Sequence, residues 1–122
     1  MAKSAHDPEG YLLFVYGSLK RGQSNHQELA AGQFVSTART APRFALRIIS
    51  GYPALVPGTS AILGELYRLD AGALAGLDEF EGSAYVRKEI ELADGERALV
   101  YLASVPDAGV HHPGDEWPAP GA

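Results

Sequence analysis

The sequence predicts an α+β fold in which a small mixed β-sheet, strongly curved or barrel-like, is accompanied by two short helices. Three observations support this fold class. About six segments have the alternating or continuously apolar pattern of β-strands, and only two have helical spacing. Parallel strands need long crossover connections, which two short helices cannot supply between every pair of strands. The 14 glycines and 8 prolines also suit a turn-rich fold better than a helical bundle.

The first strand is expected over residues 11–16, where a continuously apolar run predicts burial on both faces of the sheet. The dipeptide Asp94-Gly95 is a strong hairpin signal and predicts that the last two strands pair with each other. The remaining strands are expected where apolar residues alternate: 33–40, 43–50, 62–69, 85–92 and 97–103, with a short candidate at 54–56.

Two helices are expected, at 24–32 and from Asp70 to Gly82. Ser24 followed by Gln27 has the capping-box pattern, which predicts that the first helix begins at Ser24. Asp70 is a suitable N-cap for the second helix, and a glycine at its end is typical of a helix C-terminus. The apolar residues of this second helix are spaced by three: Leu74, Leu77 and Phe80.

The length of 122 residues corresponds to one domain. We expect a flexible leader at 1–10, the folded domain at 11–105 and an irregular Pro/Gly-rich tail at 106–122. No run of about 18 apolar residues is present, so no membrane span is expected. The polar start lacks the apolar core of a signal peptide, which predicts a cytoplasmic protein.

Charge and composition exclude several function classes. The net charge of −5 would be repelled by phosphate backbones, so nucleic acid is not an expected partner. The absence of cysteine removes disulfides, thiolate metal sites and a Cys nucleophile. His111-His112 lies near Asp115-Glu116, but no regular spacing places these residues on one face, so neither a metal nor another cofactor is expected. Composition leaves the oligomeric state open.

The first candidate site is the loop at 16–22, between the first strand and the first helix. Backbone N–H groups at such a junction can bind an anion or a carbonyl oxygen, and Gly17 and Gly22 permit close approach. The loop lacks the spacing of a phosphate-binding Walker loop and of a Gly-x-Ser-x-Gly nucleophile turn. An ordinary strand-to-helix turn remains an alternative. Spacing also leaves open a Ser18–His–Asp triad, although no motif supports one.

The second candidate is the acidic end of the second helix, which carries Asp78, Glu79 and Glu81. The helix dipole opposes carboxylates at this end. A solvated helix surface accounts for Asp78 and Glu79. Glu81 follows Phe80 and precedes a glycine, so a turn could direct it inward, where apolar surroundings would raise its pKa as a general base requires.

Two segments resemble the signatures of the γ-glutamylcyclotransferase-like family, which includes AIG2-like and BtrG-like proteins. The first is Phe-Val-Tyr-Gly-Ser-Leu-Lys-Arg-Gly-Gln-Ser-Asn-His at 14–26, and the second is Leu-Asp-Glu-Phe-Glu-Gly at 77–82, followed by Tyr85 and Arg87. Gly-Glu-Leu-Tyr at 64–67 resembles the strand before the second signature. The likeness covers about residues 12–103 and is nearest the γ-glutamylamine cyclotransferase branch.

The resemblance implies a small mixed α+β fold around a barrel-like sheet. It implies an enzyme that releases 5-oxoproline and a free amine from a γ-glutamyl amine or a small γ-glutamylated metabolite, without a metal. Glu81 matches the catalytic glutamate, with the role of general acid and base. The residues that match the substrate-binding positions are Tyr16, Gly17, Ser18, Leu19 and Tyr85.

The chemistry agrees with the resemblance, because forming 5-oxoproline requires one base, donors for an oxyanion and a substrate held in a folded shape. Two other functions remain open. The first is a non-catalytic small-molecule binding module that keeps the same pocket. The second is an unrelated carboxylate-dependent hydrolase, for which Glu65 would be the second acid.

Overall fold

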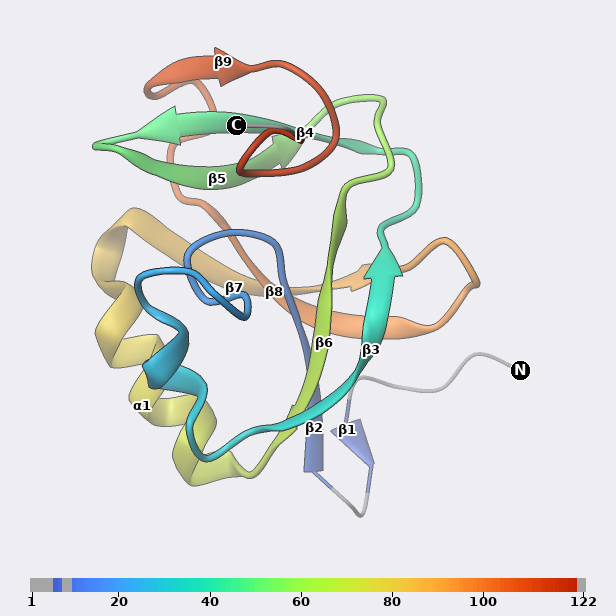
Figure 1. Cartoon of the computed structure of the whole chain (residues 1–122), viewed down its shortest axis with the longest axis vertical. Helices are drawn as coiled ribbons and strands as arrows, with labels where there is room; N and C mark the ends of the chain where they lie inside the picture. The colour runs from blue at the N-terminus through green and yellow to red at the C-terminus, as the bar shows by residue number, and fades with distance from the viewer. Residues whose placement is uncertain (1–5, 8–9, 121–122) are drawn as a thin grey trace.

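The computed structural model describes residues 6–7 and 10–120 and contains one mixed β-sheet with one α-helix packed against it (Figure 1). The helix is α1 (Ala71–Glu81), and two short 3-10 helices are η1 (His26–Leu29) and η2 (Gly82–Ala84). The strands are β1 (His6–Asp7), β2 (Gly10–Val15), β3 (Gln33–Arg39), β4 (Phe44–Ile49), β5 (Tyr52–Pro57), β6 (Leu63–Leu69), β7 (Tyr85–Glu91), β8 (Arg97–Ala103) and β9 (Val110–His112).

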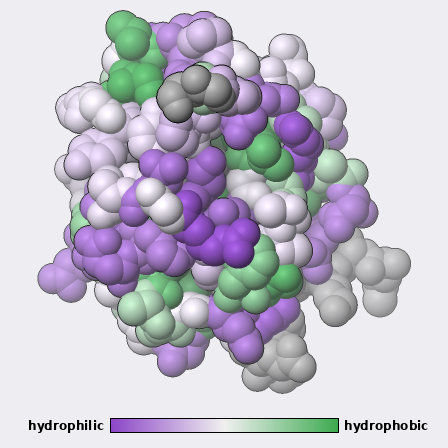
Figure 2. Space-filling view, in the orientation of Figure 1, coloured by the Kyte–Doolittle hydropathy of each residue, from purple (hydrophilic) through white to green (hydrophobic). Residues whose placement is uncertain are grey.

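The sheet runs in the order β3-β6-β2-β8-β5-β4-β9, with β1 paired to β2 and β7 paired to β8. Strand β8 pairs in parallel with both β2 and β5, and the other pairs are antiparallel. The mixed α+β class expected from the sequence is therefore confirmed. The β4–β5 hairpin and β9 lie at one end of the molecule, and α1 covers one side of the other end (Figure 1). The face seen in this orientation is mostly hydrophilic or of intermediate hydropathy, with hydrophobic residues in small separate patches (Figure 2).

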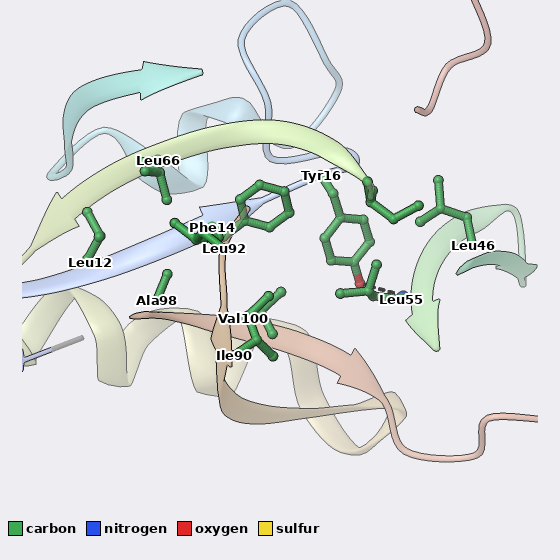
Figure 3. Close-up of a cluster of buried hydrophobic side chains, with 11 residues drawn as sticks. Leu12, Phe14, Tyr16, Leu46, Leu55, Leu66, Ile90, Leu92, Ala98 and Val100 are labelled. Carbon is green, nitrogen blue, oxygen red and sulfur yellow. Dashed lines mark hydrogen bonds between the residues drawn. The ribbon is translucent and has the colours of Figure 1, made fainter. Parts of the chain in front are cut away.

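Strand β2 separates two hydrophobic clusters because its side chains alternate between the two faces of the sheet. Leu12 and Phe14 point into the cluster enclosed by the curled sheet (Figure 3). Leu13 and Val15 point to the opposite side, where the helix packs against them. The burial of both faces expected for this strand is thus confirmed.

Tyr16, the residue after β2, connects two strands through its buried hydroxyl group. The Tyr16 hydroxyl donates to the backbone oxygen of Tyr101 on β8 at 2.6 Å. The backbone N–H of Leu55 on β5 donates to the same hydroxyl at 2.9 Å (Figure 3). Strands β5 and β8 meet at a single register pair, Leu55 with Leu102. The Tyr16 hydroxyl therefore provides hydrogen-bond partners for backbone groups at a place where β5 and β8 pair over a single register position.

The prediction of a capped helix at 24–32 is wrong. Only the 3-10 turn η1 forms, its N-cap is Asn25, and no side chain caps it. The Asn25 side chain donates to Ser18 Oγ at 2.9 Å, and its backbone N–H donates to the backbone oxygen of Ser18 at 2.9 Å. These bonds fold the segment back onto the preceding loop.

The second helix agrees with the prediction at both ends but not along its whole apolar face. Asp70 caps it by accepting from the Ala73 N–H at 2.8 Å, and it ends at Gly82. Leu74 and Leu77 are buried, whereas the Phe80 side chain is 44% exposed. Steps of three fall short of the 3.6-residue turn, so the series rotates off the buried face by its third member.

The tail is wrongly predicted to be irregular throughout, because residues 110–112 form β9 on the edge of β4. Trp117 packs against the hydrophobic cluster inside the curled sheet, and Asp115 accepts a hydrogen bond from Arg39 at 2.9 Å. Of the expected leader at 1–10, most residues lie outside those described, and His6–Asp7 form β1. Within the described part of the chain, no helix is both long and apolar enough to cross a membrane.

The Tyr16 bridge predicts a stability loss for Tyr16→Phe. The substitution keeps the ring but leaves the Leu55 N–H and the Tyr101 oxygen without their partner, which costs about 1–3 kcal/mol. Chemical denaturation measures the change in the free energy of unfolding. Tyr52→Phe is the control, since Tyr52 is exposed and its hydroxyl makes no hydrogen bond within residues 6–7 and 10–120. A loss as large in the control would contradict the bridge.

Replacing either of two glycines in the α1 region by alanine is expected to change stability, in opposite directions for the two positions. Gly82 has φ 65° and ψ −154°, a conformation nearly restricted to glycine, so Gly82→Ala costs about 1–3 kcal/mol of stability. Gly76 lies in the middle of α1 with open space around it, so Gly76→Ala stabilises by about 0.5–1 kcal/mol. Thermal unfolding of both variants tests the pair, and a destabilised Gly76→Ala protein would refute the helix assignment.

Candidate functional site

An open pocket, the inner cavity, lies where the loop after β2 faces the end of α1 and the start of β7. Every site residue predicted from the sequence lines it: Tyr16, Gly17, Ser18, Leu19, Glu81 and Tyr85. Pro53 on β5 and Tyr101 on β8 complete much of the wall. The structure thus brings together two segments that are more than fifty residues apart in the sequence.

Two backbone donors of the loop, the N–H groups of Ser18 and Leu19, are unused by the described residues. Gly17 packs against β5 so closely that a Cβ there would overlap the Pro53 ring, which explains a glycine at this position. The Gly17 oxygen accepts from the Lys20 N–H at 3.0 Å, which closes a tight turn. None of the hydrogen bonds between described residues uses the N–H of Ser18 or Leu19. Both N–H groups therefore remain as donors for an oxygen held in the cavity.

Glu65 holds this loop in place and is not part of the cavity wall. Its Oε1 accepts from the Arg21 backbone N–H at 3.0 Å and from the Tyr67 hydroxyl at 3.0 Å. The Arg21 guanidinium lies 3.5 Å from Oε2 and stacks 3.9 Å from the centre of the Phe34 ring. The hydrolase alternative required Glu65 as a second acid at the site, and the structure places it elsewhere.

Three tyrosines line the inner cavity, and each uses its hydroxyl to bind another part of the protein. Tyr16 bridges β5 and β8, Tyr85 donates to the Pro53 oxygen at 2.9 Å, and Tyr101 donates to Asp78 Oδ1 at 2.8 Å. Burial raises the pKa of Tyr16 well above its usual value and the pKa of Tyr85 to about 12. Burial also raises the pKa of Tyr101. These side chains form a neutral wall and do not exchange protons near neutral pH.

Glu81 is the remaining titratable group on the wall, and it ends α1. Its carboxylate is half-buried and makes no hydrogen bond or ion pair with any residue that the structure describes. Burial raises the pKa of Glu81 to about 7, which is the direction expected from its apolar surroundings. A carboxylate with this pKa can both accept and return a proton near neutral pH.

Asp78 has a role that the sequence reasoning missed. It was assigned to a solvated helix surface, yet it binds the Tyr101 hydroxyl and forms an ion pair with Arg87 at 3.0 Å. These contacts attach the end of α1 to β7 and β8 and so fix the position of Glu81. Arg87 follows the second signature in the sequence. A cation at this place indicates an acidic partner nearby, and this is the signal that could have identified Asp78. Glu79 is exposed, as expected.

The other candidates do not assemble a site. Ser18 Oγ is bound by the Asn25 side chain, and His26 Nδ1 lies 2.9 Å from the Leu19 oxygen, so neither residue contributes to a triad. His111 is exposed, and His112 Nε2 lies 2.9 Å from the Glu116 oxygen. Among residues 6–7 and 10–120, no three His, Asp or Glu side chains gather as metal ligands would.

A second, larger pocket, the outer cavity, adjoins the first. The two cavities share Ser18, Glu81 and Tyr85. Its other lining residues are Asn25, Tyr52 and Phe80, none of which the sequence singled out as a site residue. Gly51-Tyr-Pro53 has the composition of a turn, so no sequence pattern indicates that Tyr52 and Pro53 face a site from β5.

Known proteins resemble this chain in sequence and in structure. Gamma-glutamylaminecyclotransferase A of Danio rerio is 38% identical over 113 residues, which cover 78% of this chain and 70% of the relative. A gamma-glutamylcyclotransferase family protein of Escherichia coli K12 is 33% identical over 100 residues, covering 80% of this chain and 87% of the relative. The crystal structure of a mouse AIG2-like protein is 30% identical and superposes with a TM-score of 0.72, covering 87% of this chain and 86% of that one.

The family model described as gamma-glutamyl cyclotransferase, AIG2-like, matches residues 13–119, which is most of the chain. The matched region contains the loop after β2, the end of α1 and the tyrosines that line the inner cavity. The family suggested by the two sequence signatures is thus confirmed. The chain belongs to the AIG2-like gamma-glutamyl cyclotransferase family.

Proposed function

We propose that this protein is an enzyme that converts a γ-glutamyl amine, or a small γ-glutamylated metabolite, into 5-oxoproline and a free amine, with Glu81 as general acid and base. One observation carries the proposal. A carboxylate with no partner in the described structure and a pKa of about 7 shares a cavity with the unused N–H groups of Ser18 and Leu19. The relatives named gamma-glutamylaminecyclotransferase and gamma-glutamylcyclotransferase support it.

The reaction is an internal acyl transfer. The α-nitrogen of the glutamyl group attacks its own γ-carbonyl carbon, a new C–N bond closes a five-membered lactam, and the C–N bond to the leaving amine breaks. The α-ammonium gives up two protons, one before it attacks and one after the new C–N bond has formed, and the leaving nitrogen gains two as it departs and becomes an ammonium. Glu81 can carry a proton from the α-nitrogen to the leaving nitrogen in each transfer, so that no net proton is consumed.

The cavity supplies what the carboxylate alone cannot. The neutral walls of Tyr16, Tyr85 and Tyr101 confine a folded substrate, which places the amine close to the carbonyl carbon. The developing oxyanion accepts hydrogen bonds from the Ser18 and Leu19 N–H groups. A binding module with this pocket would gain nothing from an unpartnered carboxylate beside a carboxylate-bearing ligand, so the enzyme is favoured over it.

Glu81→Gln tests the role of the base. The amide keeps the size of the side chain but cannot accept a proton, so turnover of γ-glutamyl substrates falls about 10²–10⁴-fold. Release of 5-oxoproline is the measurement, with a panel of γ-glutamyl amines as substrates. Glu79→Gln is the matched control, because Glu79 lies two residues earlier on α1 and faces solvent. Normal turnover by Glu81→Gln, or failure of the control, would show that another group is the base.

The raised pKa of Glu81 predicts how activity depends on pH. The base must be ionised, so kcat/KM for the parent protein rises with pH and levels off above about 7. The tyrosines that face Glu81 titrate far above this range and do not contribute. A kcat/KM profile that is flat between about pH 5 and 8 would contradict this prediction.

The same pKa predicts a stability difference that does not depend on activity. Between about 4.5 and about 7 the folded protein holds a proton on Glu81 that the unfolded chain has released. The parent therefore loses stability relative to Glu81→Gln as pH rises through this window, and the difference stays constant above it. Thermal unfolding of both proteins at several pH values measures the difference, and a parent protein that gains stability relative to Glu81→Gln as pH rises through the window would refute it.

A further inference from the structure

The outer cavity differs in character from the inner one. Two aromatic side chains stand at its rim with much of their surface in solvent, Tyr52 at 45% and Phe80 at 44% exposure. Asn25, a neutral amide, also lines it, and the Asn25 side chain already donates to Ser18 Oγ. No Lys, Arg or His is among its lining residues in the described part of the chain.

The residues common to both cavities indicate how a substrate divides between them. Ser18 and Glu81 line each cavity, so the γ-carbonyl carbon, where one C–N bond forms and another breaks, lies at their boundary. The glutamyl half belongs in the inner cavity, which is bordered by the loop that carries the N–H donors. The substituent of the leaving amine then occupies the outer cavity.

The charges around the outer cavity determine which substituents fit. A carboxylate there would meet no cation among the lining residues and would lie near the carboxylate of Glu81. Burying an unpaired charge is costly, and two like charges repel at short distance. An apolar group would instead cover the exposed rings of Tyr52 and Phe80 and remove their surface from water.

We propose that the outer cavity is the leaving-group subsite and that it selects an amine with an apolar, preferably aromatic, substituent and no carboxylate. Tyr52 and Phe80 are its specificity-determining residues. This inference rests on the proposed cyclotransferase function and names the substrate class for it.

Three compounds distinguish the effect of the substituent's charge from the effect of its shape. γ-Glutamylphenylalaninamide and γ-glutamylphenylalanine have nearly the same size and differ by one negative charge, and γ-glutamylalaninamide is neutral but lacks the ring. We expect kcat/KM of the parent protein for the phenylalaninamide to exceed that for each of the other two by about tenfold or more. Release of 5-oxoproline and binding by calorimetry are both measured.

Two variants test the aromatic residues. In Tyr52→Ala and in Phe80→Ala, the ratio of kcat/KM for γ-glutamylphenylalaninamide to kcat/KM for γ-glutamylalaninamide falls several-fold toward one. Each substitution removes one ring from the subsite. Both residues are exposed, so the variants should fold, which thermal unfolding checks. Val105→Ala is the control: Val105 is 60% exposed, lies outside both cavities and should leave every ratio unchanged.

The outcomes distinguish this inference from the proposed function. If 5-oxoproline is released but γ-glutamylphenylalanine is used as well as its amide, the subsite assignment fails and the proposed function stands. If no compound releases 5-oxoproline, the proposed function fails for this substrate class. Calorimetry then decides the subsite: tighter binding of the phenylalaninamide, lost in Tyr52→Ala, supports it, and equal binding of all three compounds overturns it.

Discussion

The hydroxyl group of Tyr16 is the point on which the fold and the site both depend. It joins the Tyr101 oxygen on β8 to the Leu55 N–H on β5, where the two strands share one register pair. The ring that carries this hydroxyl also forms part of the inner cavity wall. A buried donor or acceptor without a partner is costly, so the position of the ring is fixed by the needs of the backbone. The wall of the cavity is rigid for the same reason.

Tyr85 and Tyr101 repeat this arrangement with other elements. Tyr85 binds the start of β5 through the Pro53 oxygen, and Tyr101 binds α1 through Asp78. Each hydroxyl is thus used in holding the β4–β5 hairpin or the helix against β7 and β8. Their rings line the same cavity as Glu81, whose burial there disfavours its charged form. The contacts that assemble the fold therefore produce the chemical property of the site.

Sequence could predict the features that depend on local pattern. The apolar run of β2 and the N-cap at Asp70 depend on near neighbours, and both are observed. Strand β9 could not be predicted, because its short polar segment gains regular structure only from pairing with β4. The capping box at Ser24 does not form, and Asn25 instead bonds to Ser18, seven residues earlier in the chain. In each failure, a tertiary partner decided the local conformation.

The site likewise contains residues that local sequence pattern could predict and residues that it could not. The signatures identified the loop and Glu81, whereas Tyr52 and Pro53 face the cavities only because β5 pairs with β4 and β8. Glu65 and Glu81 show most clearly why sequence alone was insufficient. Glu65 receives hydrogen bonds from Arg21 and Tyr67 and serves as an anchor, while Glu81 receives none from the described residues and keeps an exchangeable proton. The number of hydrogen-bond donors around a carboxylate distinguishes a structural role from a catalytic one. Those donors come from elements that only the fold brings together.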